Sequence, residues 1–184
     1  MTDIFDAGEP TSLEAIMTNN AWRERQENEL SKQYPEQTIL SFRLDVPGLI
    51  KQSPTLVDIF SDSMRRLERL FRPMLTYRVD DLQRVTGPEA FLVLNECQTA
   101  VQMLTYRFEQ TDPLGYMFNL DVVNLDPAAN QFSRHELGFP EKACVVCGDD
   151  AKICMGVQKH SIDEVTRTFN QRYTFYVNKL RVAK

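Results

Sequence analysis

An apolar stripe at helical spacing between Ser53 and Pro73 constrains the fold more than any other feature of the sequence. Ser53 followed by Pro54 is typical of the N-cap and first residue of a helix, and Pro73 predicts its end. The apolar residues between them recur every three or four positions and are Leu56, Ile59, Phe60, Met64, Leu67 and Phe71. A helix with such a stripe buries that face against another element, so we expect it at the centre of the core.

Alternating or short apolar runs predict strands on both sides of this helix. Residues 38–46, TILSFRLDV, alternate between two faces, and residues 75–85, 90–94 and 113–123 also have the pattern of strands. A turn is expected over 124–131.

Three further helices are predicted. The first and the last are opened by capping boxes, Thr11-x-x-Glu14 and Ser161-x-x-Glu164, and the middle one covers about 97–109. The apolar face of the first helix is expected to begin with Leu13, Ile16 and Met17. Helices and strands mix without strict alternation, which is typical of the α+β class.

Length and charge limit the classes of function. A chain of 184 residues fits one domain over residues 1–184 that can bury a core without disulfides. The formal net charge of -5 disfavours nucleic acid and anionic membranes as partners. The N-terminal sequence is acidic, without the apolar stretch of a signal peptide, and no apolar run is long enough to cross a membrane. We therefore expect a cytoplasmic protein whose residues 1–10 are disordered.

Three of the four cysteines cluster in the C-terminal third, in the pattern Cys144-x2-Cys147-x6-Cys154-x5-His160. Three thiolates and an imidazole make a complete tetrahedral set of Zn²⁺ ligands, and such a closed site would be structural. The alternative is three reduced thiols in a small subdomain over 140–160. The sequence alone leaves both interpretations open.

The strand over 113–123 carries an amide and a carboxylate on one face. Asn119 and Asp121 are two residues apart, so their side chains point the same way with Cα atoms roughly 6–7 Å apart. Two oxygen ligands at this spacing can converge on a hard cation such as Mg²⁺, whereas the alternative is a half-exposed strand whose polar residues face water. Lys51 and Arg134 have a similar ambiguity, because each can hold a phosphate or face solvent.

Short motifs spread over most of the chain carry a resemblance to a known family. They are RERQ, LSF, PGLIK, GPE, PLG, LDV, SR and the Cys/His pattern. In this order and spacing they resemble the citrate lyase holo-acyl-carrier-protein synthases, also called apo-citrate lyase phosphoribosyl-dephospho-CoA transferases. The resemblance runs from about Leu13 to about Val165. It implies a mixed β-sheet flanked by helices in a nucleotidyltransferase-like arrangement.

The resemblance also implies a reaction. The family transfers phosphoribosyl-dephospho-CoA from triphosphoribosyl-dephospho-CoA to a serine of the acyl carrier subunit of citrate lyase and releases diphosphate. Asp121 is implied as the principal Mg²⁺ ligand and as the base, with Asn119 beside it and Glu89 in support. The residues implied to hold phosphates are Lys51, Ser133 and Arg134.

Five polar positions depart from the family pattern. Asn119 stands where the family has an aspartate, and Gln102 stands where a lysine is common. Positions where arginine is usual hold Tyr116, Ala143 and Gly156. The loss of a carboxylate and of several cations predicts weaker binding of Mg²⁺ and of a triphosphate. The alternative function is therefore a catalytically impaired homologue that acts as a carrier-protein-binding module.

Overall fold

The structure, a computed structural model, describes residues 2–123 and 132–182, so the predicted turn over 124–131 lies outside the described residues. The helices are α1 (Leu13–Gln33), α2 (Pro54–Phe71), α3 (Gln98–Thr111), the 3₁₀ turn η1 (Gly115–Met117), α4 (Ala151–Gly156) and α5 (Ile162–Val182). The strands are β1 (Thr38–Leu44), β2 (Leu75–Asp81), β3 (Glu89–Leu94) and β4 (Phe118–Val122). In these described ranges, no helix combines the length and apolar character that a membrane span requires.

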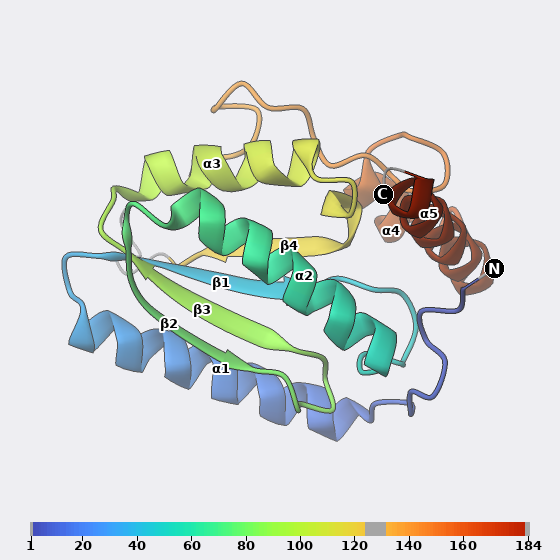
Figure 1. Ribbon diagram of the computed structural model, residues 1–184, viewed down its shortest axis with the longest axis horizontal. Coiled ribbons are helices and arrows are strands. Elements are labelled where there is room, and N and C mark those ends of the chain that lie inside the picture. The colour runs from blue at the N-terminus through green and yellow to red at the C-terminus, as the bar shows by residue number, and fades with distance from the viewer. Residues whose placement is uncertain (1, 124–131, 183–184) are drawn as a thin grey trace.

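The four strands form one sheet in the order β2-β3-β1-β4 (Figure 1). Each neighbouring pair is antiparallel, so the prediction of a mixed sheet is wrong and that of the α+β class is confirmed. The chain order β1-α2-β2-β3-α3-β4 with this strand order is the ferredoxin-like arrangement of two split βαβ units. Strands β1 and β2 run parallel, but β3 lies between them, which is why every direct pairing is antiparallel. This arrangement makes β4 an edge strand.

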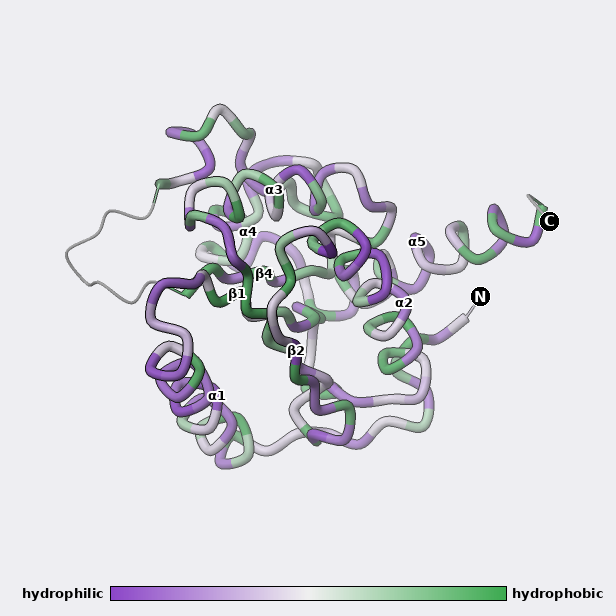
Figure 2. Tube along the Cα trace, turned by 60° about the vertical axis from the view of Figure 1, so that its left-hand side comes forward, coloured by the Kyte–Doolittle hydropathy of each residue, from purple (hydrophilic) through white to green (hydrophobic). Residues whose placement is uncertain are grey.

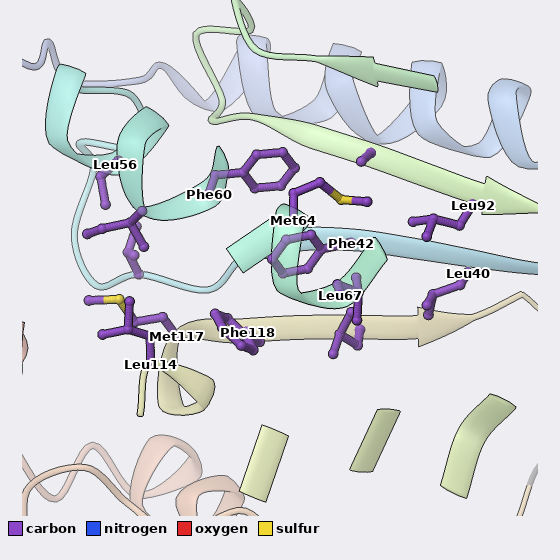
Figure 3. Packing of buried hydrophobic residues seen from close by; sticks show 14 of the residues in the cluster. Leu40, Phe42, Leu56, Phe60, Met64, Leu67, Leu92, Leu114, Met117 and Phe118 are labelled. Atoms are coloured by element: carbon purple, nitrogen blue, oxygen red, sulfur yellow. The ribbon is translucent and has the colours of Figure 1, made fainter. Parts of the chain in front are cut away.

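Helices α2 and α3 cover one face of the sheet and form the main core. Every residue of the predicted stripe on α2 is buried, which confirms that prediction. At the centre, the ring of Phe42 stacks on Phe60 at a centroid distance of 4.7 Å and meets the ring of Phe118 edge-on at 5.4 Å (Figure 3). Aromatic pairs in these geometries add to the free energy gained from apolar burial. These contacts in the core fix the position of Phe118, the first residue of β4.

Helix α1 covers the opposite face, and it packs there with few apolar residues. Leu30 is buried with Ile39 and Phe91 of the sheet, while most of the helix is hydrophilic (Figure 2). The expected apolar face is wrong at Leu13 and Met17, whose side chains are 72% and 64% exposed. Polar side chains of α1 therefore face the sheet.

The N-terminus of α1 differs from its prediction by one residue. Ser12 is the N-cap, since its Oγ accepts a hydrogen bond from the N–H of Ala15 at 3.1 Å. The hydroxyl of Thr11 instead donates to the carbonyl of Val85 at 2.8 Å. The predicted capping box at the start of α5 is confirmed, because Ser161 and Glu164 exchange hydrogen bonds.

The N-terminal segment packs between the domain and α5. The sequence analysis expected disorder over residues 1–10, whereas Ile4 is fully buried in the main core. The N–H of Ile4 donates to Asn170 Oδ1 of α5 at 3.0 Å, and Ser53 Oγ donates to the carbonyl of Ile4 at 2.5 Å. Figure 1 shows the N-terminus beside α5. These contacts hold α5 at the end of the sheet where β4 begins.

Candidate functional site

The polar face of β4 is the candidate site that the sequence pointed to. Phe118, Leu120 and Val122 are buried toward the main core, so Asn119 and Asp121 lie on the other face, as predicted. The Asp121 side chain is 54% exposed, and its Oδ2 lies 3.1 Å from Nη1 of Arg43. An oxygen pair at an edge strand, open to solvent, is a suitable donor set for a hard cation.

A cavity of about 370 Å³ borders Asp121. Its polar wall includes Glu27 of α1 together with Gln102 and Tyr106 of α3. Sequence reasoning missed Glu27. Asn19, Arg23 and Glu27 recur every four residues, and this spacing places three polar side chains on one face of α1, which is the signal that could have revealed the residue.

Burial affects the carboxyl of Glu27. It raises the pKa of Glu27 above its ordinary value of 4.5; Arg23 opposes the rise and Asp121 adds to it. The cavity therefore brings together two carboxylates from elements that are far apart in the sequence.

Glu89 does not lie beside Asp121. It pairs across the sheet with Arg43, which in turn pairs with Asn119, so two strand spacings, roughly 9–10 Å, separate Glu89 from Asn119. The carboxylate of Glu89 is 1% exposed and accepts two hydrogen bonds of 2.7 Å from Arg23 and one of 2.5 Å from Asn19. These contacts anchor α1 to the sheet, and Glu89 supports the site through them.

The structure places Lys51 away from the Asp121 cavity. Its Nζ donates to the carbonyl of Val46 at 2.5 Å, in the loop that follows β1. Burial lowers the pKa of Lys51, and nearby Asp45 opposes that effect. Lys51 thus lies at the end of β1, at the same end of the sheet where β4 begins.

Arg134 and Ser133 lie on the α3 side of the site. The guanidinium of Arg134 is 4.2 Å above the ring of Tyr106 and forms an ion pair with Glu109. The Ser133 hydroxyl donates to Glu136 Oε2 at 2.7 Å. Because Tyr106 also lines the Asp121 cavity, Arg134 lies next to that cavity, behind an aromatic wall.

Lys142 is a second residue that sequence reasoning missed. Its Nζ donates to the carbonyl of Phe118, the first residue of β4, at 2.6 Å. Burial lowers the pKa of Lys142, while Asp45 and Asp121 oppose this and Arg134 adds to it. The ammonium group of Lys142 is therefore influenced by Asp45 in the loop after β1, by Asp121 on β4 and by Arg134 on the α3 side. Its sequence context, EKAC, has no distinguishing pattern.

The Cys/His segment brings its four predicted ligands together. The Sγ atoms of Cys144, Cys147 and Cys154 and a ring nitrogen of His160 lie within 4.8 Å of one another. His160 Nε2 is buried and has no hydrogen-bond partner among the described residues. The backbone N–H groups of Val146 and Cys147 donate to Cys144, as N–H groups do around zinc-bound thiolates. The donor set and its convergence fit a tetrahedral Zn²⁺ ion.

Comparison with known proteins gives consistent similarities along nearly the whole chain. Residues 11–176 match the family described as apo-citrate lyase phosphoribosyl-dephospho-CoA transferase. A protein named probable apo-citrate lyase phosphoribosyl-dephospho-CoA transferase, from Streptococcus pyogenes serotype M18, is 28% identical over 96% of this chain and 93% of its own length. A protein of the same name from Vibrio cholerae is 28% identical over 83% of this chain and 85% of its own.

A longer relative is also similar. Protein CitXG of Leuconostoc mesenteroides is 34% identical over 99% of this chain, which spans 39% of the length of that relative. Protein CitXG of Haemophilus influenzae is 32% identical over 89% of this chain, and 35% of that protein is covered. The matched region is thus found both alone and as part of longer proteins.

Proposed function

The chain belongs to the apo-citrate lyase phosphoribosyl-dephospho-CoA transferase family, and we propose that it carries out the transfer that the family's name describes. The donor is triphosphoribosyl-dephospho-CoA, and the acceptor is a serine of the acyl carrier subunit of citrate lyase. The observation that carries the assignment to a site is the polar face of β4, where Asp121 borders a cavity and Asn119 lies two residues before it on the same face. The three cysteines of the Cys/His segment form no disulfide, which suits a cytoplasmic protein.

The reaction is a nucleotidyl transfer. The serine oxygen attacks the α-phosphorus, the bond from that phosphorus to the bridging oxygen breaks, and diphosphate leaves with the bond electrons. Asp121 accepts the serine proton as general base, because its carboxylate is exposed at the cavity and the carrier serine can reach it. The proposal rests on the residues of the β4 face and not on the expected nucleotidyltransferase-like arrangement, because the same sheet can serve as scaffold for many reactions.

Asp121 and Asn119 would hold Mg²⁺ through a carboxylate oxygen and an amide oxygen. Mg²⁺ bound there would neutralise negative charge on the phosphate oxygens of the donor. The fit is weaker than for two carboxylates, because Asn119 carries no charge and Arg43 already pairs with Asp121. A Mg²⁺ ion must therefore compete with the Arg43 guanidinium for Asp121.

Cationic side chains around this face would hold the donor. Arg134 beside the cavity and Lys51 at the end of β1 would contact phosphates as charged donors, in exchange for Glu109 and the Val46 carbonyl respectively. The N–H and hydroxyl of Ser133 both donate to Glu136, so they would add neutral contacts only when that carboxylate is displaced. Glu89 positions α1 through Arg23. The Cys/His segment holds a structural Zn²⁺, since four protein ligands leave no open coordination position for a substrate.

Mass spectrometry of the carrier subunit tests the proposal. The apo carrier subunit is incubated with triphosphoribosyl-dephospho-CoA, Mg²⁺ and either the parent protein, Asp121→Asn or Asp163→Asn, the last an exposed carboxylate on α5 as control. The parent and the control are expected to add the prosthetic group, and Asp121→Asn to slow the addition at least about 100-fold. A carrier that binds the parent protein but gains no mass would instead indicate the impaired, carrier-binding homologue.

A further inference from the structure

We propose that two adjoining cavities at the junction of β4, the Cys/His segment and α5 form one nucleotide site, with a cationic part for the polyphosphate and an apolar part for the nucleotide body. This inference rests on the proposed function and assigns its donor a binding place. The cationic cavity has a volume of about 340 Å³ and is lined by Arg134, Lys142 and Arg172. The apolar cavity has a volume of about 360 Å³.

The charges of the cationic cavity favour an anion although acidic residues also line it. Glu109 is occupied by Arg134, and Asp112 is held by Arg66 through hydrogen bonds of 2.5 and 3.0 Å. Glu141, the third acidic residue of the lining, has its Oε2 3.8 Å from Nζ of Lys152. Lys142 and Arg172 are different, since they belong to no ion pair within residues 2–123 and 132–182. Their charges are therefore available to a polyphosphate, which makes short charge-assisted hydrogen bonds with such groups.

Both cations are held in place by neutral acceptors. Lys142 Nζ donates to the carbonyl of Phe118 at 2.6 Å, and Arg172 Nη2 donates to the carbonyl of Val145 at 2.9 Å. The guanidinium of Arg172 also lies 5.4 Å from the centroid of the Tyr116 ring. Preorganised donors of this kind lose little side-chain entropy when an anion binds.

Tyr116 joins the two cavities. It lines both of them, together with Lys142, Ala143 and Cys144. Its hydroxyl is buried and has no hydrogen-bond partner among the described residues, an arrangement that favours a ligand atom as the missing partner. Burial raises the pKa of Tyr116 well above its usual range, so the hydroxyl keeps its proton and can donate.

The apolar cavity is suited to the body of the nucleotide. Its apolar lining includes Val46, Val145, Met155, Ile162, Val165 and Phe169. The adenine and pantetheine parts of dephospho-CoA offer apolar surface that such a lining can cover. Away from Lys142 and Tyr116, where this cavity joins the cationic one, a phosphate would be desolvated with few partners. Lys142 Nζ donates to the carbonyl of Phe118, three residues before Asp121 on β4, so a polyphosphate at Lys142 would extend toward the proposed reaction centre.

Calorimetric titration with two probes tests the two parts separately. Inorganic tripolyphosphate is titrated into the parent, Lys142→Gln, Arg172→Gln and the control Arg167→Gln, which removes an exposed charge on the same helix as Arg172. Glutamine can still donate to the Phe118 or Val145 carbonyl, so the fold is kept while the charge is lost. We expect each cavity variant to bind tripolyphosphate at least about tenfold more weakly and the control to bind like the parent.

Dephospho-CoA is titrated into Ile162→Asp and into the control Leu13→Asp. Both residues are exposed apolar residues in the first turn of a helix, where an aspartate is tolerated. Ile162→Asp is expected to bind dephospho-CoA at least about tenfold more weakly while its affinity for tripolyphosphate changes much less. A site with two parts is supported when Lys142→Gln and Arg172→Gln weaken binding of tripolyphosphate and Ile162→Asp weakens binding of dephospho-CoA.

Either of two results overturns the inference. One is that Lys142→Gln and Arg172→Gln bind tripolyphosphate like the parent, and the other is that Ile162→Asp binds dephospho-CoA like Leu13→Asp. Carrier modification by the parent protein together with these results would leave the proposed function intact and move its donor elsewhere. Conversely, matched losses of binding without carrier modification would keep the nucleotide site and reject the transfer.

Discussion

Arg43 reaches diagonally across the strand pair so that its Nη1 lies 3.1 Å from Oδ2 of Asp121, while its direct cross-strand partner is Asn119. The guanidinium thus stands beside the carboxylate that is proposed to hold Mg²⁺. An adjacent cation stabilises the ionised carboxylate but competes with a metal ion for its oxygens. Because Arg43 competes with Mg²⁺ for Asp121, the absence of a second carboxylate at Asn119 should weaken Mg²⁺ binding.

Restoring that carboxylate should change the response to Mg²⁺. Asn119→Asp places two carboxylates on one face of β4, which repel each other without metal, so the variant should melt at a lower temperature than the parent in chelator. Mg²⁺ should raise the melting temperature of the variant more than that of the parent, because it binds the folded state. Asn28→Asp, which adds the same charge at an exposed position of α1, is the control. If Mg²⁺ raises the melting temperature of all three proteins equally, the polar face of β4 binds water and not Mg²⁺.

The Cys/His segment should hold about one Zn²⁺ per chain, measured by elemental analysis of protein purified without chelator. Cys147→Ser should lose the metal and lower the melting temperature, because binding the ion and folding the segment are coupled. Cys97→Ser is the matched control, since Cys97 is exposed at the start of α3, outside the cluster. If chelator leaves the melting of the parent unchanged, the segment is a set of reduced thiols.

The parts of the fold that could be predicted from the sequence are those fixed by local periodicity. The stripe on α2 and the alternation on β4 each depend on one element and one buried face, and the structure has both. The capping box of α5 is similarly local. The convergence of the three cysteines with His160 could be predicted because their spacing within one short segment limits how far apart they can lie.

Strand order and long-range polar contacts could not be predicted in this way. The sheet is antiparallel because β3 enters between β1 and β2, and no local pattern encodes that position. Helix α1 shows its polar side to the sheet because Glu89, far along the chain, accepts hydrogen bonds from Arg23 and Asn19. Ile4 is ordered for the same kind of reason, since its partner Asn170 belongs to α5. The cavity at Asp121 could not be predicted for the same reason, because Glu27 lines it only once α1 has packed against the sheet.

The contact between Arg23 and Glu89 should contribute strongly to stability. Arg23→Ala leaves a carboxylate that is 1% exposed without its cation, which should lower the free energy of unfolding by about 3–5 kcal/mol in urea titrations. Arg25→Ala, an exposed arginine on the same helix, should change it by no more than about 0.5 kcal/mol. Adding Glu89→Gln to Arg23→Ala should recover part of the loss, because the unpaired charge is then removed. Equal effects of the two arginine variants would mean that the buried carboxylate is not dependent on Arg23.

Glu27 should make stability depend on pH at the edge of the Asp121 cavity. Its pKa is raised in the folded protein, chiefly by burial, so the folded state binds the proton more tightly than the unfolded chain does. The stability that this proton supplies is fully present below the ordinary pKa of 4.5 and is lost as the pH rises through the raised value. Glu27→Gln does not ionise, so the free energy of unfolding of this variant should rise relative to the parent on going from acidic to neutral pH.

Urea titrations of the parent, Glu27→Gln and the control Glu24→Gln over that pH range measure the effect. Glu24 is exposed on α1, three residues before Glu27, so its substitution removes the same charge from the solvent side. The advantage of Glu27→Gln should be small in acid and grow toward neutral pH, while Glu24→Gln should follow the parent. A pH-independent difference between Glu27→Gln and the parent would mean that the Glu27 carboxyl is hydrated in the folded protein and that folding does not raise its pKa.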